Sequence, residues 1–177
     1  SIGISHNSDS FAAGMEAAGA AINNLPNKPQ VLMILNTPDY DSEAVLSGIT
    51  STGRDIPAFG CTADGIFTKY GFFNNNLVAV MAMMSGDFEL IFNFAEGIPR
   101  ESGKIGLEFA QKFLPYIFQT HHHDLYSSLL ILIHNLLNMD AITKSINNVL
   151  GPLCSVIGSP AHHGFTGPYI NGTIRPN

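Results

Sequence analysis

Two uninterrupted hydrophobic runs stand out in the chain, at residues 31–35 and 129–133. Runs of this length are typical of strands that are buried on both faces of a sheet. Each run is followed by a polar stretch, a segment with helical periodicity and a second short hydrophobic strand that ends in glycine, Gly60 in the first copy and Gly158 in the second. The distance from the run to its glycine is the same in both copies. There are only two copies, and each is too long for a solenoid repeat. The pattern therefore predicts an internally duplicated α/β unit.

A strand, a helix and a second strand joined by short connections form a unit with parallel strands and a right-handed crossover. We expect one such unit in each of two similar halves, at about residues 1–97 and 98–177, within a single domain. Two further β-prone runs, residues 77–84 and 88–94, flank Ser85-Gly86-Asp87 and predict an antiparallel hairpin. The predicted fold class is α/β, with a mixed, mostly parallel sheet and helices packed on it.

Small residues, helical periodicity and capping residues together predict where the helices lie. An Ala-rich stretch follows Ser8-Asp9-Ser10, and Asp41 or Ser42 can cap the next helix. We expect helices at about residues 11–22, 42–52, 102–114 and 139–150, and a last strand at residues 169–174.

Composition restricts the class of protein. Hydrophobic residues make up 45% and charged residues 12%, so we expect much of the chain to be buried in a core or covered by something else. The net charge of −6 and the lack of a basic stripe argue against nucleic acid and anionic membranes as partners. No hydrophobic run reaches the roughly 18 residues of a membrane span, so we expect no membrane insertion.

Cysteine content and the start of the chain bear on its compartment. Cys61 and Cys154 are the two cysteines, and no secretory signal precedes them, so we expect free thiols and a cytoplasmic location. Ser1 opens directly on an expected strand, so we also expect a piece of a longer chain.

Ligands of open α/β sheets bind beyond the carboxyl ends of the strands. Short polar side chains and glycines with accessible backbone N–H groups follow the expected strands here, as in a pocket for a small molecule. An equally open alternative is that the glycines only form tight turns. The candidate ligand-binding residues are Asn36, Thr37, Gly60, Cys61, Thr62 and Ala63 in the first half and Asn135, Gly158, Ser159 and His162 in the second.

One motif resembles a known family. Gly60-Cys61-Thr62-Ala63-Asp64-Gly65-Ile66, with Asp39-Tyr40-Asp41 upstream and the early Ala-rich helix, resembles the FIST N domain over nearly the whole chain. The resemblance implies a non-enzymatic intracellular sensory module that binds a small polar ligand, with amino acids as candidates. It also implies a signalling output partner, commonly a FIST C domain, which is absent from this chain. Ile66-Phe67 stands where the family has Glu-Ile, and residues 159–163 replace an acidic run.

The histidines leave a second interpretation open. No cofactor is required by the sequence, but His162 or His163 could be an axial ligand of haem, as in nitric-oxide sensors that FIST-type proteins resemble. Such a haem would be non-covalent, because no Cys-x-x-Cys-His motif is present. The tract His121-His122-His123 is better explained as a solvated loop, and no zinc-ligand spacing is found.

Two further interpretations complete the set. Cys61 could pair with a histidine of the second half in a hydrolase-like enzyme, although a small packed cysteine fits as well. Asp39, Asp41 and Asp64 are expected to be turn and cap residues. The chain could also be an inert scaffold with a hydrophobic face. The phenylalanines that would form either the core or a face against a second domain are Phe72, Phe73, Phe88, Phe92 and Phe94.

Overall fold

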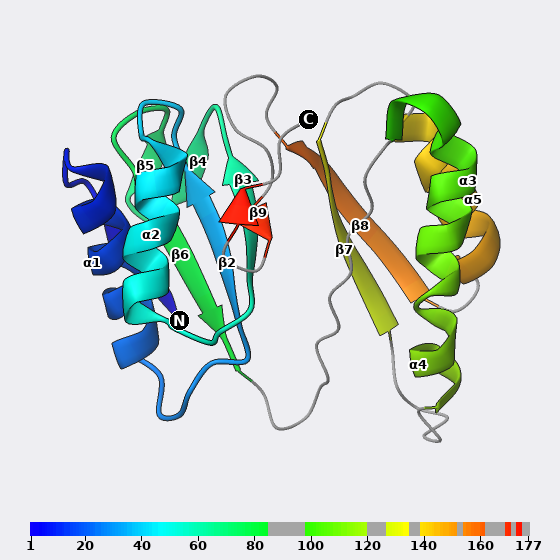
Figure 1. The fold of residues 1–177 in the computed structure, drawn as a ribbon, viewed down its shortest axis with the longest axis horizontal. Coiled ribbons are helices and arrows are strands. Elements are labelled where there is room, and N and C mark those ends of the chain that lie inside the picture. Colours follow the sequence, from blue (N-terminus) through cyan, green and yellow to red (C-terminus); the bar gives the residue numbers. More distant parts are fainter. Residues whose placement is uncertain are drawn as a thin grey trace. The chain divides into compact units, whose positions relative to one another are not determined.

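The computed structural model in Figure 1 divides into two compact units. Unit 1 comprises Ser1–Leu90 and Ala161–Asn177, and unit 2 comprises Ile91–Pro160. These bounds differ from the halves expected above, because the last residues of the chain join the first unit. The structure describes residues 1–84, 98–119, 127–134, 139–151, 154–161, 169–170 and 173–174.

Unit 1 is an α/β structure built on a mixed six-stranded sheet with the order β1-β6-β2-β3-β9-β10. Strands β2 and β3 pair in parallel, and the other neighbouring pairs described in this sheet are antiparallel. The expectation of a mostly parallel sheet is therefore not confirmed here. The elements are β1 (Ile2–Ser5), α1 (Ser10–Asn23), β2 (Val31–Asn36), α2 (Ser42–Thr52), β3 (Ala58–Thr62), β4 (Ile66–Thr68), β5 (Gly71–Phe73), β6 (Val78–Met83), β9 (Tyr169–Ile170) and β10 (Thr173–Ile174).

The two helices of unit 1 begin where the sequence predicts, because an aspartate caps each of them. Asp9 Oδ1 accepts a hydrogen bond from Ala12 N at 2.7 Å, and Asp41 Oδ1 accepts one from Glu43 N at 2.9 Å. Each carboxylate thus satisfies a backbone N–H that has no partner inside its helix. The interpretation of Asp41 as a cap residue is confirmed.

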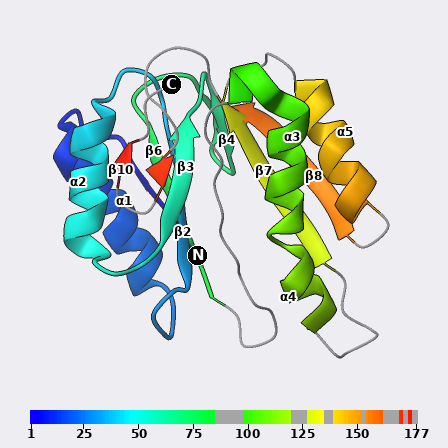
Figure 2. The same cartoon turned by 45° about the vertical axis from the view of Figure 1, so that its right-hand side comes forward.

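Helices α1 and α2 lie side by side on one face of the sheet, as Figures 1 and 2 both show. They approach closely because a glycine stands at each contact: a Cβ on Gly14 would overlap the backbone of Val45, and one on Gly48 would overlap the backbone of Phe11. Four alanines of α1 are fully buried, namely Ala13, Ala17, Ala18 and Ala21. Leu32, Ile34, Val45, Ile49 and Val80 complete this core.

The predicted hairpin partner of residues 77–84 falls at residues 88–94, outside the described residues. Residues 78–83 do form a strand, β6, but it pairs with β1 and β2. An antiparallel hairpin of a different kind is present: β4 and β5 pair with each other, joined by a turn at Lys69-Tyr70. Tyr169–Ile170 and Thr173–Ile174 form two short antiparallel strands, where a single strand was expected over residues 169–174.

Unit 2 contains α3 (Ile98–Gln111), α4 (Leu114–Gln119), β7 (Ser127–His134), α5 (Met139–Leu150) and all but the last residue of β8 (Cys154–Ala161). Strands β7 and β8 are neighbours, and α3 packs on α5 at Gly106, where a Cβ would lie 2.8 Å from Ile142 O. Apart from the short additional helix α4, the order helix, strand, helix, strand is the same as in α1 to β3. That order alone does not confirm a duplication, which stays a prediction. The core of this unit is formed by Ala110, Phe113, Ile142, Ile146 and Leu150.

Candidate ligand site at the strand ends of unit 1

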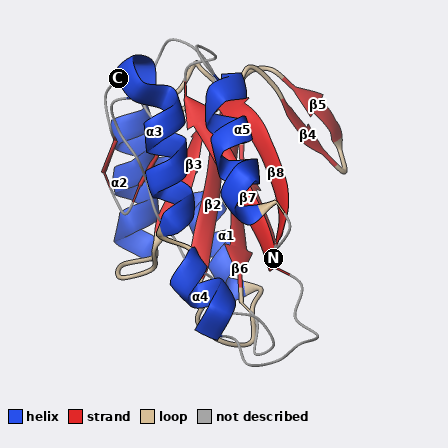
Figure 3. Cartoon of the chain, turned by 90° about the vertical axis from the view of Figure 1, so that its right-hand side faces the viewer, coloured by secondary structure: helices blue, strands red, loops and turns tan. Residues whose placement is uncertain are grey.

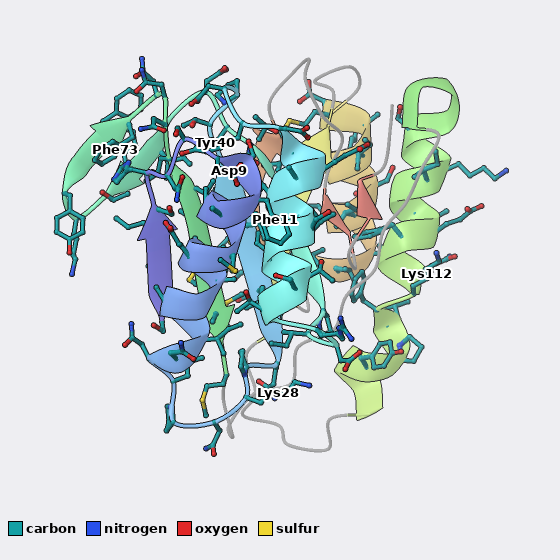
Figure 4. All side chains as sticks on the ribbon, turned by 60° about the vertical axis from the view of Figure 1, so that its left-hand side comes forward. Asp9, Phe11, Lys28, Tyr40, Phe73 and Lys112 are labelled. Atoms are coloured by element: carbon teal, nitrogen blue, oxygen red, sulfur yellow. The ribbon has the colours of Figure 1, made fainter. Side chains whose placement is uncertain are left out.

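Three strands of unit 1 end at the same edge of the sheet. Strand β6 is antiparallel to both β1 and β2, and β2 is parallel to β3, so β1, β2 and β3 all run in one direction. Their last residues are Ser5, Asn36 and Thr62. Helices α1 and α2 begin at this edge as well, and in Figure 4 Asp9 and Tyr40 lie near each other at that end. We call this region the strand-end edge.

Buried polar side chains gather at the strand-end edge. Asn36, Thr37, Ser42 and Thr62 are each at most 2% exposed, in a unit whose other fully buried side chains are almost all hydrophobic. Asn36 Nδ2 donates to Thr37 O at 2.9 Å and to Ser42 Oγ at 3.5 Å. Asn36 O accepts from Ala63 N at 2.9 Å. Asn36 therefore connects the end of β2 to the start of α2 and to the segment that leaves β3.

Thr37 fastens the loop after β2 to the start of β6. Its Oγ1 donates to Leu77 O at 3.3 Å and accepts from Leu77 N at 3.1 Å, while Thr37 N donates to the same carbonyl at 3.0 Å. Both residues are completely buried. Buried backbone groups need hydrogen-bond partners. The Thr37 hydroxyl supplies to Leu77 the bonds that a neighbouring strand would otherwise give it.

Asn76 lies where three segments meet at the edge. Asn76 N donates to Asp39 Oδ2 at 2.8 Å, and the ring of His6 donates through Nδ1 to Asn76 O at 2.7 Å. The hydroxyl of Tyr40 lies 2.9 Å from both Asn76 Oδ1 and Asn7 O. Asn76 has a φ of 51°, a left-handed conformation that asparagine adopts more readily than most residues. These bonds hold the loop before β6 against the ends of β1 and β2.

Two ionisable groups at the edge respond to these surroundings. Burial, helped by the charges of Asp39 and Glu16, raises the pKa of Tyr40 to about 12. Hydrogen bonds from the Ser5 hydroxyl at 2.6 Å and from Asn7 Nδ2 at 2.8 Å lower the pKa of the exposed Glu16 carboxyl. Tyr40 therefore stays a neutral hydroxyl, and Glu16 stays a carboxylate, throughout the physiological range.

The structure places five of the candidate residues at this edge, namely Asn36, Thr37, Cys61, Thr62 and Ala63. Gly60 differs from the expectation, because it lies inside β3 and not in a turn after it. A Cβ on Gly60 would overlap the backbone of Ile34 in β2, so glycine is needed there for strand packing.

Of the four candidate ligand-binding residues in the second half, the structure describes Gly158 and Ser159. Gly158 and Ser159 lie within β8, again inside a strand and not beyond its end. Asn135, His162 and His163 lie outside the described residues, as does the tract 121–123. The haem interpretation and the pairing of Cys61 with a histidine of this half stay untested for that reason.

The sequence interpretation missed Ser42, Tyr40 and Asn76 as members of the edge. The sequence predicts Ser42 as a possible helix cap, but Asp41 is the cap, and the Ser42 hydroxyl accepts a hydrogen bond from Asn36 Nδ2. The tract Asn74-Asn75-Asn76 is a turn signal, which could have indicated a sharp loop at this position.

The cysteines and the possible metal-binding side chains can be located only within the described residues. Cys61 is buried, and burial raises the pKa of the Cys154 thiol, which disfavours its reactive thiolate form. Among the described residues, no three side chains of the metal-binding types lie close enough together to hold an ion. None of the described helices has the length and hydrophobicity to cross a bilayer.

The fold and the edge define an α/β domain whose strand ends carry a polar, uncharged cluster beside two helix N-termini. The chain belongs to the FIST N domain family, whose profile matches residues 30–175. The match begins just before β2, and it confirms the resemblance noted from the Gly-Cys-Thr motif. No match was found among curated proteins or among solved structures. Membership in this family makes the chain a sensory module of signal transduction, in keeping with a non-enzymatic role.

Proposed function

We propose that the strand-end edge of unit 1 binds a small polar metabolite, with amino acids as the first class to test, and that binding is relayed to a signalling partner domain such as a FIST C-like domain. We place the module in the cytoplasm, where the free thiols of Cys61 and Cys154 stay reduced.

The observation that carries the proposal is the gathering of Asn36, Ser42 and Thr62 at the carboxyl ends of two parallel strands. In α/β folds this is the usual position of a ligand. An amide and two hydroxyls supply donors and acceptors without net charge, which suits a neutral or zwitterionic molecule. A ligand would exchange bonds with these groups, so its affinity comes from replacing existing partners with better ones.

The edge also offers a route for the signal. The segment from Ala63 to Leu77 contains the β4–β5 hairpin, and both of its ends bond to the loop after β2, at Asn36 O and at Thr37. A ligand that shifts this loop would move both ends of the hairpin together. A sensor needs a ligand that binds one conformation more tightly than another, and a shift of this loop and hairpin would supply the second conformation.

The test is a thermal-shift screen of the twenty amino acids and related small acids, followed by calorimetric titration of any hit. We expect one chemical class to raise the melting temperature, because a ligand at about 100 times its Kd stabilises the fold by roughly 2.7 kcal/mol. Thr62→Val should abolish the shift, and Thr68→Val at the end of β4 should leave it unchanged. A shift that survives Thr62→Val would place the ligand elsewhere, and no shift from any compound would count against the proposal. Haemin, followed by visible absorption, tests the alternative of a haem sensor.

A further inference from the structure

An Asp-Gly pair stands on the loop that leaves β3. Asp64-Gly65 is the one pair of this kind in the sequence. Asp64 lies at an exposed bend, Gly65 is half-buried, and neither residue belongs to a strand. In Figure 3 loops, drawn in tan, join the β4–β5 hairpin to the rest of unit 1. An aspartate in such a loop can be attacked by the next backbone nitrogen, and glycine hinders this attack least because it has no side chain.

The attacking atom, the backbone nitrogen of Gly65, forms no hydrogen bond to any described residue. A nitrogen that donates a hydrogen bond must first break that bond, so a bonded nitrogen protects the aspartate before it. Asp55 gives the contrast, because it is also exposed but is followed by Ile56, whose nitrogen donates to Gly53 O at 3.1 Å. Other nitrogens that follow an asparagine or aspartate and donate a hydrogen bond are those of Thr37, Tyr40, Asn76 and Leu77.

The packing of the hairpin requires glycine at position 65. A Cβ on Gly65 would overlap the ring of Phe72, which lies against this part of the loop. Phe72 in turn packs on Phe67, with ring centroids 4.8 Å apart. A bulkier residue, which would slow the attack, can enter only if this aromatic pair shifts. The fold therefore keeps an unhindered nitrogen next to Asp64.

We propose that Asp64-Gly65 is a modification site, at which aspartate isomerises to isoaspartate without an enzyme. Gly65 N attacks Cγ of the protonated Asp64 carboxyl, an N–Cγ bond forms, and the carboxyl hydroxyl leaves as water with the proton of the nitrogen. Water then opens the resulting succinimide ring. When the bond from Gly65 N to the main-chain carbonyl carbon of Asp64 breaks, the main chain runs through Cβ and Cγ; when the N–Cγ bond breaks, aspartate is restored. The net change conserves every atom and the single negative charge.

Isomerisation adds one atom to the main chain between β3 and β4. On one side of the site Ala63 N donates to Asn36 O at 2.9 Å, and on the other side Ile66 is buried at the start of β4. A longer chain between two attachments must bulge or release one of them, so we expect the hairpin to move relative to the strand-end edge. The modification requires no ligand at this edge, but it acts on the connection through which the proposed signal would pass.

The experiment ages the purified 177-residue chain at body temperature and mildly acidic pH for several weeks. Trypsin then cleaves after Arg54 and Lys69 and releases residues 55–69, which contain both Asp55 and Asp64. Electron-transfer fragmentation distinguishes isoaspartate from aspartate at each position, although the mass is the same. We expect at least about fivefold more isoaspartate at Asp64 than at Asp55, which is the factor that one hydrogen bond on the attacking nitrogen supplies.

Two variants of the exposed Asp64 test the chemistry. Asp64→Asn should react faster, because a neutral amide needs no prior protonation. Asp64→Glu keeps the charge and should abolish the reaction, because a six-membered ring closes far more slowly. An isoaspartate methyltransferase gives a second readout, since it transfers a labelled methyl group from the sulfonium of S-adenosylmethionine to the new α-carboxylate. Asn171-Gly172, outside the described residues, falls in a different tryptic peptide and adds nothing to the label on residues 55–69.

Thermal unfolding of the fresh variants shows that the fold is kept. No more isoaspartate at Asp64 than at Asp55 overturns the proposal, as does equal labelling of residues 55–69 in Asp64→Glu. A reaction at Asp64 that occurs only after unfolding in urea also overturns it, because the folded loop then protects the site. Amide hydrogen exchange of β4 and β5 should be faster in the aged chain than in the fresh one, and unchanged exchange would refute the displacement of the hairpin. Ligand screening uses fresh protein, so its outcome is independent of these results.

Discussion

A single buried hydroxyl should have a large effect on the stability of unit 1. Thr37→Val keeps the shape of the side chain but replaces the hydroxyl with a methyl group. Leu77 N then loses its acceptor at 3.1 Å, and Leu77 O loses a donor at 3.3 Å but keeps the bond from Thr37 N at 3.0 Å. The backbone N–H of Leu77 is left without this partner in a place that water does not reach.

The magnitude follows from these contacts. A buried donor without a partner costs about 1–3 kcal/mol, and the longer bond to a carbonyl that keeps another donor adds at most about 0.5 kcal/mol. We therefore expect Thr37→Val to lower the free energy of unfolding by about 1–3.5 kcal/mol. For a chain of this size, about 2–4 °C per kcal/mol gives a fall of about 2–14 °C in the melting temperature.

Thr68→Val is a matched control. Thr68 Oγ1 donates to Gly71 O at 3.3 Å and accepts from Tyr70 N at 3.0 Å, nearly the same distances as for Thr37, but at an exposed turn. Water can replace these bonds, so the loss should stay below about 0.5 kcal/mol. Urea unfolding followed by circular dichroism measures both variants. Amide hydrogen exchange of β6 reports on unit 1 by itself. Equal losses for the two variants would refute the argument from burial.

Three further predictions concern the same unit. Gly14→Ala should destabilise it by about 1–3 kcal/mol, because the new Cβ overlaps the backbone of Val45. Gly19→Ala on the same helix should be neutral or slightly stabilising, because the nearest atom is 3.9 Å away; equal thermal shifts would contradict the close packing of α1 on α2. Asp41→Ala should cost about 1 kcal/mol in urea unfolding by removing the cap of α2, and Asp41→Asn should restore most of it. Tyr40, with its pKa raised to about 12, should give a late step in an absorbance titration of the tyrosines, and Tyr40→Phe should remove that step. Since the folded state holds this proton more tightly, its contribution is present below pH 10 and is lost as the pH rises toward 12, so wild type should lose more stability than Tyr40→Phe in that interval.

The sequence predicts the local elements well where the signal is local. The predicted start of α2 at Ser42 is confirmed. Asp41 is a favourable N-cap, and its side chain accepts hydrogen bonds from the first turn of the helix. Strand β2 is a continuous hydrophobic run whose residues are buried or half-buried, and its parallel pairing with β3 follows from the crossover through α2. These features depend on residues within one segment, so a periodic pattern is enough to find them.

Pairing between distant segments is where the prediction fails. Strand β6 lies between β1 and β2 and pairs antiparallel with both. A hydrophobic run predicts a strand, but it does not predict which other strands that strand will pair with. The hairpin of β4 and β5 was missed because each strand has three residues, too few for an alternation to stand out. A family pattern at Ile66 and Phe67 gives residue types and not exposure, although the first side chain is buried and the second is exposed.

Gly60-Cys61-Thr62 shows why a glycine motif cannot be assigned to ligand binding from its pattern alone. The pattern is compatible with a glycine that admits a ligand and with one that admits a neighbouring strand. The structure favours the second, because the backbone of Ile34 occupies the space where a Cβ of Gly60 would be. The close approach of β2 and β3 that Gly60 permits brings Ala63 N within 2.9 Å of Asn36 O, and thereby places Thr62 beside Asn36 at the edge. Gly60 thus contributes to the proposed site through the spacing of the strands, so Gly60→Ala should disturb the fold of unit 1 as well as any binding at its edge.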